Sequence, residues 1–184
     1  MQSHLILGGQ RSGKSRFAER LGLRWLAQAA SHRVSVVATA LAGDDEMRDR
    51  IDRHRQDRPA GFEVLEAPYQ LGSCIQAWSQ PDRMVVVDCL PLWLTNWLMP
   101  LEEDASLAQD WPVARADLLR SLERARGPVV LVTNEIGWGV IPSGAGVRRF
   151  VDELGRLNQD VAQRCKLVTL MAAGQPWTQE VQAW

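Results

Sequence analysis

The sequence predicts an α/β fold, in which a mainly parallel β-sheet carries helices on both faces. Short, continuous apolar runs are typical of strands that are covered on both faces. Amphipathic stretches with helical spacing separate these runs, and such an alternation predicts parallel strands joined through helices. The expected strands are Leu5–Leu7, Val34–Ala38, Glu63–Glu66, Met84–Asp88, Val129–Thr133 and Leu167–Met171. The expected helices span roughly residues 14–29, 44–57, 69–79, 90–99, 112–126 and 145–164.

Size and composition predict a single domain over residues 1–184. A chain of 184 residues can bury a sizeable core, and no internal repeat, low-complexity tract or long linker divides it. Hydrophobic residues make up 46% of the chain and the formal net charge is -1, so no global field attracts it to nucleic acid or to a membrane surface. The apolar runs are far too short to cross a bilayer, and we expect no membrane insertion.

The cysteines and the N-terminal segment indicate the compartment. Cys74, Cys89 and Cys165 lie far apart and form no C-x-x-C pair, which fits a reducing environment and argues against a zinc site or a disulfide framework. The N-terminus runs into the first expected strand without a basic flank, so we expect no secretion signal. A cytoplasmic location is the expectation.

The first strand–helix unit contains the most specific motif of the chain. The apolar run Leu5–Leu7 precedes it, and an amphipathic stretch with Phe17, Leu21 and Trp25 four residues apart follows it. Between them, Gly-Gly-Gln-Arg-Ser-Gly-Lys-Ser matches the phosphate-loop pattern G-x-x-x-x-G-K-[ST]. The residues of this loop are Gly8, Gly9, Gln10, Arg11, Ser12, Gly13, Lys14 and Ser15.

The residue types of this loop suit a bound polyphosphate. Glycines let the backbone wrap closely around a phosphate with its N–H groups pointing inward, and the helix that follows adds its positive dipole end. Lys14 is expected to reach the outer phosphates, and the Ser15 hydroxyl is expected to bind Mg²⁺. A glycine turn that only joins strand to helix would explain the glycines, but not Lys14 and Ser15 at this spacing.

The stretch 44–57 follows the second strand and is expected to be helical. Acidic residues open it and basic residues close it, as the helix dipole favours. Met47, Ile51 and His54 fall on one stripe at i, i+4 and i+7. Four arginines surround His54 in the sequence: Arg50, Arg53, Arg55 and Arg58.

Two interpretations of this helix stay open on composition. The first is a solvated, salt-bridged helix with His54 at the edge of its apolar face, and composition alone favours it. In the second, neighbouring arginines lower the pKa of His54, so that the imidazole stays neutral and nucleophilic at pH 7. The same cations would hold a triphosphate and stabilise a departing pyrophosphate while His54 attacks an α-phosphate.

The carboxyl ends of parallel strands are where ligands bind, and three ends carry polar residues: Thr39, Asp88 and the segment 133–135. Asp88 ends a strand that in phosphate-loop proteins places a carboxylate near Mg²⁺, but it could equally cap the helix that begins near Leu90. Glu135 could be a base, a metal ligand or a local cap. In the helix 90–99, Trp93 and Trp97 lie one turn apart, which favours a core or subunit-interface helix over a ligand wall.

Sequence blocks along essentially the whole chain resemble a known family. The blocks are Gly8–Arg16, Ala38-Thr39, Asp44–Met47, Arg50-Ile51, His54-Arg55, Arg58-Pro59, Val87–Leu90, Thr95-Asn96, Leu131–Glu135 with Gly137 and Gly139, Pro142, and Arg156–Gln159. Together they resemble the bifunctional adenosylcobinamide kinase / adenosylcobinamide-phosphate guanylyltransferase of cobalamin assembly. The phosphate loop is shared by many families, whereas the blocks around His54 and Glu135 are far more specific.

This resemblance implies two reactions and a set of site residues. A nucleoside triphosphate, ATP or GTP, first phosphorylates adenosylcobinamide; GTP then guanylylates a histidine, and GMP passes to the substrate phosphate to give adenosylcobinamide-GDP. The resemblance also implies a RecA-like fold, assembly as a homotrimer, and Mg²⁺ held by Ser15 and Asp88. The guanylylated histidine falls on His54, Lys14 is expected to hold the phosphates, and the nucleotide contacts fall on Gly8–Ser15, Ala38, Thr39, Ala40, Arg55, Gln56, Asp57, Arg58, Glu66 and Asp88.

Two rival functions remain on the sequence. One is a phosphate-loop kinase of another small metabolite without guanylyl transfer, which the absence of covalent labelling would favour. The other is a nucleotide-dependent binding module or switch, although the Asn-Lys-x-Asp signature of common guanine switches is absent. No basic stripe or aromatic set indicates a nucleic-acid path.

Overall fold

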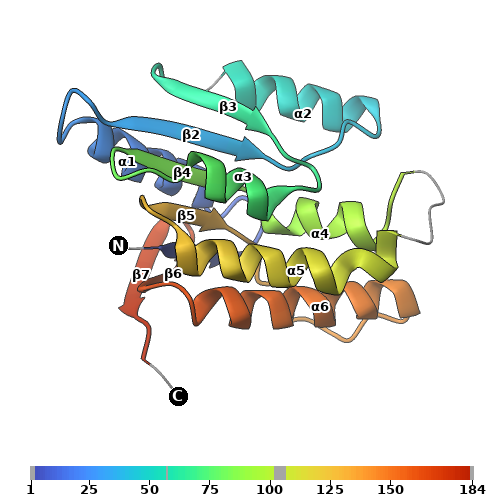
Figure 1. Ribbon diagram of the computed structural model, residues 1–184. Helices are drawn as coiled ribbons and strands as arrows, with labels where there is room; N and C mark the ends of the chain where they lie inside the picture. Colours follow the sequence, from blue (N-terminus) through green and yellow to red (C-terminus); the bar gives the residue numbers. More distant parts are fainter. Residues whose placement is uncertain (1–2, 57, 102–106, 183–184) are drawn as a thin grey trace.

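A computed structural model describes residues 3–56, 58–101 and 107–182. For Arg50, His54, Arg55 and Gln56 it describes the backbone but not the side chain. Strands and helices alternate along the chain through most of its length (Figure 1). The elements are β1 (His4–Gly8), α1 (Lys14–Leu26), β2 (Arg33–Ala38), α2 (Asp45–Gln56), β3 (Phe62–Glu66), α3 (Leu71–Trp78), β4 (Arg83–Asp88), α4 (Leu90–Leu98), α5 (Leu107–Arg124), β5 (Val129–Val132), α6 (Ala145–Ala162), β6 (Leu167–Ala172) and β7 (Gln175–Glu180).

The strands form one 7-stranded sheet in the order β3-β2-β4-β5-β1-β6-β7. β1 to β6 pair in parallel, and β7 pairs antiparallel with β6. The mainly parallel α/β fold expected from the alternation of apolar runs and helices is therefore confirmed. Because the first six strands share one direction, their carboxyl ends lie along a single edge, which is where ligands bind in such sheets.

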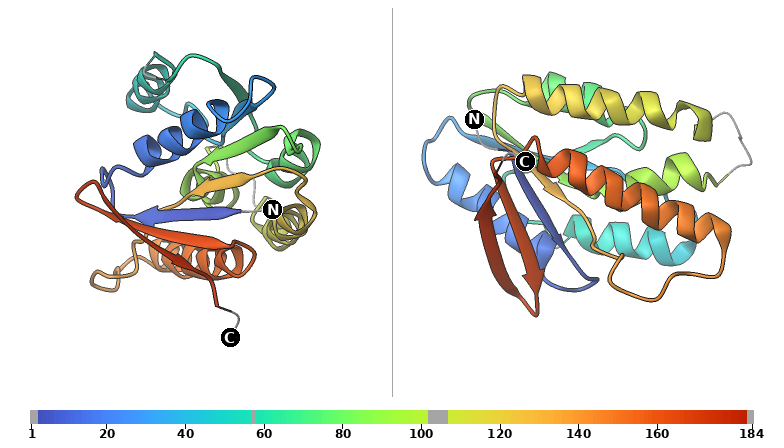
Figure 2. Two further views of the ribbon diagram at one scale, coloured as in Figure 1. Left: turned by 90° about the vertical axis from the view of Figure 1, so that its left-hand side faces the viewer. Right: turned by 90° about the horizontal axis from the view of Figure 1, so that it is seen from below.

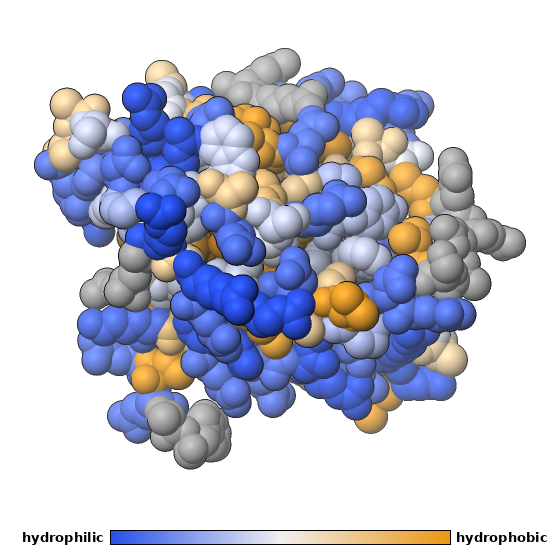
Figure 3. All heavy atoms as spheres, in the orientation of Figure 1, coloured by the Kyte–Doolittle hydropathy of each residue, from blue (hydrophilic) through white to orange (hydrophobic). Residues whose placement is uncertain are grey.

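Alternate residues of the central strands face two separate cores. Val37, Val85 and Leu131 belong to a core shared with α3, α4, α5 and α6, whereas Val36 and Val86 belong to a core shared with α1. Helices therefore cover both faces of the sheet, as the two views of Figure 2 show. Burial on both faces explains why these strands read as continuous apolar runs rather than as alternating ones. The outer side of the α3, α5 and α6 layer is mainly hydrophilic (Figure 3).

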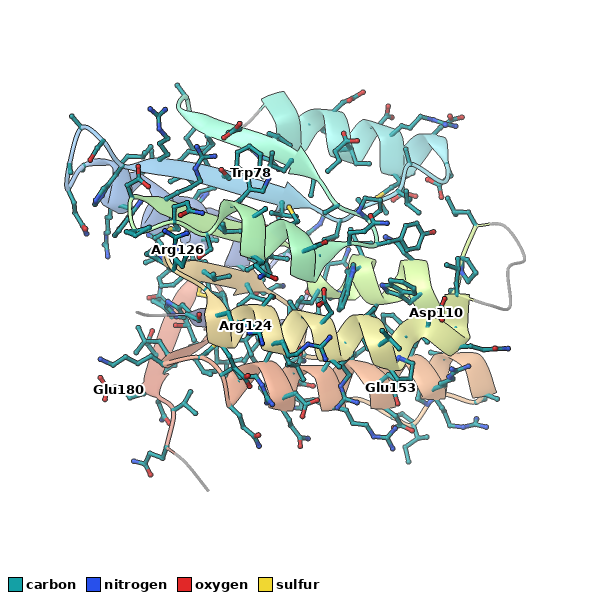
Figure 4. The ribbon with its side chains drawn as sticks, in the orientation of Figure 1. Trp78, Asp110, Arg124, Arg126, Glu153 and Glu180 are labelled. Atoms are coloured by element: carbon teal, nitrogen blue, oxygen red, sulfur yellow. The ribbon has the colours of Figure 1, made fainter. Side chains whose placement is uncertain are left out.

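Two elements differ from the expectation. β7 was not expected, because all six of its residues are exposed and it contains no apolar run. α5 begins at Leu107 rather than near residue 112, and Pro112 lies inside it. Tertiary contacts extend this helix past its proline: Trp111 is buried, and its indole N–H donates to the carboxylate of Glu153 on α6 (2.8 Å; Glu153 is labelled in Figure 4). None of the helices in the described part of the chain is long and apolar enough to span a membrane.

Candidate functional site

The phosphate loop connects β1 to α1 at the carboxyl edge of the sheet. Gly8 has φ 150°, and a Cβ atom there would lie 2.3 Å from the carbonyl oxygen of Met171. Gly13 has φ 98° and occupies the N-cap position of α1, where no side chain caps the helix. The first amides of α1 are thus left for an anion to bind.

Two polar side chains of this loop are buried within it. Lys14 is 8% exposed, and its ammonium donates to the carbonyl of Gly9 at 2.6 Å. Ser12 is 7% exposed, and its hydroxyl has no hydrogen-bond partner within the described structure. Buried polar groups are nearly always paired, so a hydroxyl of this kind beside loop amides indicates a polar ligand.

A pocket of about 720 Å³ lies over the loop, and we call it the phosphate pocket. Of the residues expected at a nucleotide site, those from Gln10 to Ser15 line it together with Asp88, and Asn134 lines it from the strand end at 133–135 that the sequence singled out. Arg16, Arg20 and Gly174 also line it and were not expected. Four cationic side chains line this pocket against the single carboxylate of Asp88, an arrangement that suits a polyphosphate. Its residues are Gln10, Arg11, Ser12, Gly13, Lys14, Ser15, Arg16, Arg20, Asp88, Cys89, Pro91, Leu92, Val132, Asn134 and Gly174.

The hairpin of β6 and β7 braces the phosphate loop from the side. Its two-residue turn, Ala173 and Gly174, has φ 50° and 77°, as tight hairpin turns require. The N–H of Gly174 donates to the carbonyl of Ser12 at 3.0 Å. The glycine in this short turn was the signal that could have revealed the hairpin.

A second pocket, of about 470 Å³, lies between α2, β3 and the start of α1, and we call it the α2 pocket. It contains several of the expected nucleotide contacts: Ala38, Ala40, Arg58 and Glu66. Aliphatic residues make up much of its wall, which suits the plane of a base or a sugar. Its residues are Ser15, Ala38, Ala40, Leu41, Ala42, Met47, Arg48, Ile51, Asp52, Arg58, Val64, Glu66, Asp88, Cys89 and Leu92.

Four residues border both pockets, namely Ser15, Asp88, Cys89 and Leu92, and the polar side chains at this junction include Ser15 and Asp88. The N-cap residue of α4 is Cys89, and no side chain caps that helix, so the structure does not support the interpretation of Asp88 as its cap. A hydroxyl and a carboxylate are oxygen donors of the kind that Mg²⁺ prefers, with further oxygens from phosphate and water. The residues present therefore fit a magnesium ion at the junction.

Thr39 is placed differently from the expected direct nucleotide contact. Its side chain is fully buried and lines neither pocket. Its hydroxyl donates to the carbonyl of Cys89 at 2.7 Å and accepts from the N–H of Cys89 at 3.0 Å. Asn96 then donates to the carbonyls of Thr39 (2.8 Å) and Pro68 (2.9 Å). The side chains of Thr39 and Asn96 thus fix the strand ends behind the pockets.

A similar polar network fixes the end of β5. Thr133 is fully buried and its hydroxyl donates to the side-chain oxygen of Asn158 at 2.8 Å. The amide of Asn158 donates to the carbonyl of Asn134 at 3.0 Å, which holds Asn134 at the wall of the phosphate pocket. Glu135 lines neither pocket; its carboxylate accepts the N–H of Gly137 at 2.9 Å, which is the local role left open by its sequence.

α2 contributes one wall of the α2 pocket. The carboxylate of Asp44 accepts the N–H of Met47 at 2.7 Å and so caps the start of the helix. Met47 and Ile51 line the pocket, and position 54 follows on the same helix. The expected contacts His54, Arg55 and Gln56 have side chains outside the described residues, and Asp57 lies outside them altogether.

The remaining candidates belong to the structure rather than to the pockets. Trp93 is fully buried, and its indole donates to the carbonyl of Tyr69 at 3.0 Å, so the expectation of a core helix is confirmed. His4 is buried at the start of β1 with its Nε2 atom 2.7 Å from the Thr169 hydroxyl, and burial lowers the pKa of His4 to about 4. Cys74, Cys89 and Cys165 are free thiols, as their spacing predicts.

Comparisons with known proteins agree over most of the chain. The sequence model of the family described as cobinamide kinase / cobinamide phosphate guanyltransferase matches residues 4–179. The bifunctional adenosylcobalamin biosynthesis protein CobP of Pseudomonas aeruginosa is 46% identical over 172 residues, which are 94% of each chain. The bifunctional adenosylcobalamin biosynthesis protein CobU of Escherichia coli is 35% identical over 179 residues, 92% of this chain and 95% of that protein.

The fold has a solved counterpart. An ATPase domain of known structure aligns with a TM-score of 0.51 and 15% sequence identity, over 92% of this chain and 68% of that one. At this identity the likeness concerns the fold alone, which is the RecA-like architecture of a phosphate-loop ATPase.

Proposed function

The chain belongs to the cobinamide kinase / cobinamide phosphate guanyltransferase family, and from this premise we propose which part of the nucleotide each of its two pockets binds. It is a bifunctional enzyme of cobalamin biosynthesis. It phosphorylates adenosylcobinamide with a nucleoside triphosphate, and it then transfers GMP from GTP to that phosphate to give adenosylcobinamide-GDP. Both reactions act on polyphosphates, which suits a site built on a phosphate loop.

The phosphate pocket holds the triphosphate in this proposal. Lys14 and the loop amides from Gly8 to Ser15 neutralise and position the phosphates. Ser15 and Asp88 hold Mg²⁺, which would supply positive charge to the phosphate oxygens when bound. Phosphoryl transfer depends mainly on positioning and charge neutralisation, so the kinase reaction needs no nucleophile from the protein.

The α2 pocket receives the nucleoside. Its aliphatic wall, including Ala38 and Ala40, packs against the flat base, and Glu66 offers a carboxylate that accepts N–H groups of guanine. Arg58 faces the same space. Thr39 contributes through its hold on Cys89, and the family resemblance adds Arg55, Gln56 and Asp57 to these contacts. The observation that carries the proposal is the junction at Ser15 and Asp88, because it makes a phosphate site and a nucleoside-sized site continuous.

His54 carries the guanylyl group between two displacements. An imidazole nitrogen attacks the α-phosphorus of GTP, an N–P bond forms, and the bond to the leaving pyrophosphate breaks. A phosphate oxygen of adenosylcobinamide phosphate then attacks the same phosphorus and the N–P bond breaks, which returns the free histidine. A ping-pong kinetic pattern follows from this sequence of steps.

Covalent labelling tests this assignment. Incubation with α-labelled GTP and Mg²⁺ is expected to leave acid-labile label on the protein, and His54→Ala is expected to abolish the label while keeping the kinase activity. Lys14→Ala is expected to lower the kinase rate by about 100- to 1000-fold, the scale of a lost charge-stabilising group. His32→Ala is the matched control, because His32 stacks on Trp25 outside both pockets.

Two results would contradict the proposal. Label that persists in His54→Ala places the covalent group elsewhere, and equal loss of both activities in that variant makes the histidine a structural or shared residue. Assembly as a homotrimer and a cytoplasmic location are further parts of the proposal; the family resemblance supports the first, and the three free thiols support the second.

A further inference from the structure

The loop between β5 and α6 exposes a group of large apolar side chains that neither pocket uses. Ile136, Trp138, Val140 and Ile141 are 39%, 76%, 95% and 79% exposed, and we call them the apolar tip. The loop projects from the body of the molecule in both views of Figure 2. Exposed apolar side chains are ordinary when scattered singly, but a group on one short segment marks a binding surface.

Hydrogen bonds hold both ends of this loop. At its start, the N–H of Glu135 donates to the carbonyl of Gly8 at 3.2 Å, and the Glu135 carboxylate accepts the N–H of Gly137. At its end, the guanidinium of Arg148 donates to the carbonyls of Pro142 and Ser143. The exposure of the tip is therefore a property of a positioned loop.

The loop lies next to the phosphate pocket. Asn134 lines the phosphate pocket and stands two residues before Ile136. The α2 pocket lies at β3, β2 and β4, whereas the loop leaves from β5, the next strand of the sheet. The phosphate loop follows β1, on the other side of β5, so the apolar tip leaves the sheet between the strand end that carries Asp88 and the phosphate loop.

Phosphoryl transfer needs its acceptor beside the outer phosphate. The attacking and leaving oxygens lie roughly in line with the transferred phosphorus, so the acceptor approaches from the side opposite the nucleoside diphosphate. An acceptor that rested on the apolar tip would lie beside the pocket that holds the triphosphate in the proposed function.

We propose that the apolar tip is the docking surface for the corrin ring of the acceptor, a proposal that rests on the proposed function. A corrin ring is broad and methylated, with a rim of uncharged amide groups. The segment from Ile136 to Val147 contains no charged residue, so it presents an apolar, uncharged surface to such a ring. Trp138 stacks on the ring, and the aminopropanol arm reaches into the phosphate pocket.

The kinase reaction tests the proposal with two exposed tryptophans. Trp138→Ala is expected to raise the KM for adenosylcobinamide about tenfold, the scale of a lost aromatic contact, while the KM for the nucleotide and the guanylylation of His54 stay unchanged. Trp177→Ala is the matched control, because Trp177 is 56% exposed on β7, at the far edge of the sheet. It is expected to leave all three quantities unchanged.

Sedimentation velocity of each variant separates this role from a contact between copies of the chain. An unchanged KM for adenosylcobinamide in Trp138→Ala overturns the proposal, and so does a raised KM that accompanies loss of assembly. If the unsubstituted protein fails to phosphorylate adenosylcobinamide, the proposed function fails. Equilibrium dialysis of adenosylcobinamide then decides the docking surface separately: weaker binding by Trp138→Ala supports it, and equal binding overturns it.

Discussion

The phosphate pocket and the α2 pocket share an edge but differ in what holds their walls. The phosphate pocket rests on backbone that is fixed by close contacts, such as Gly8 against Met171, and by buried side chains such as Asn158. The α2 pocket has one wall made by α2, and none of the described residues of that helix belongs to either hydrophobic core. The walls of the phosphate pocket are thus fixed by the folded core, whereas one wall of the α2 pocket is a helix that packs outside both cores.

The difference follows from the chemistry assigned to each pocket. Phosphate binding requires backbone amides in fixed positions, and such amides are best held by a rigid surround. In the proposed mechanism, one side chain meets the nucleotide and then the acceptor, and α2, which carries position 54, has little core packing to restrain it. Substitutions at the phosphate pocket should therefore lower both stability and activity, whereas substitutions on α2 should lower activity with little effect on stability.

The largest effect is expected at Gly8. An alanine Cβ there would meet the Met171 carbonyl, so Gly8→Ala is expected to lower the free energy of unfolding by about 1–3 kcal/mol and to impair both reactions. Gly9→Ala is the control, because no atom lies within 4 Å of a Cβ at that position. Urea denaturation measures the two variants; equal stability would show that the loop is less constrained than its contacts indicate.

An intermediate effect is expected from the two buried amides. Asn158→Ala leaves the Thr133 hydroxyl and the Asn134 carbonyl without this partner, and Asn96→Ala does the same to the carbonyls of Thr39 and Pro68. Each variant is expected to lose about 1–3 kcal/mol of unfolding free energy.

The kinase and guanylylation activities of these two variants test whether the two pockets are supported separately. Asn158→Ala is expected to lower kinase activity and guanylylation together, because it loosens Asn134 at the phosphate pocket. Asn96→Ala is expected to lower mainly guanylylation, because it acts behind the α2 pocket. The ratio of the two activities is the measurement, and an identical ratio in both variants would mean that the pockets are not separately supported.

The smallest effect on stability is expected on α2. Ile51→Ala is expected to change the free energy of unfolding by less than about 1 kcal/mol, because Ile51 lies outside both cores, while the GTP concentration for half-maximal labelling rises several-fold. Leu21→Ala on α1 is the comparison: Leu21 packs against the α1-side core, and its loss is expected to cost about 2 kcal/mol. A large loss of stability in Ile51→Ala would show that α2 is integral to the core.

Local patterns in the sequence predicted most of the fold. β2 and β4 are mainly apolar between their ends because both faces are buried, and the phosphate loop is recognisable because its backbone demands Gly8 and Gly13. β7 left no such pattern, since exposed residues impose no apolar periodicity. The contact of Gly174 with Ser12 joins residues far apart in the chain, which spacing alone does not reveal.

The candidate site was predicted unevenly for the same reason. Gln10 to Ser15 and Asp88 could be placed from one motif and one strand end. Glu66 was expected only through the family resemblance, and Arg58 also as one of the cations around His54. The fold brings them to one pocket from the end of β3 and from the segment before it. Thr39 ends a strand, and the family resemblance implied that it touches the nucleotide, but its hydroxyl is engaged by Cys89, a partner that belongs to the neighbouring strand end.

The two outermost strands also limit how copies of this chain can associate. β7 carries Pro176, which cannot donate a backbone hydrogen bond, and β3 carries Glu63 and Glu66. Prolines and charges on border strands discourage another strand from pairing there. Strand pairing between copies of this chain is therefore disfavoured, so any association of copies is expected to form through side-chain surfaces, which leaves the carboxyl edge of each sheet free.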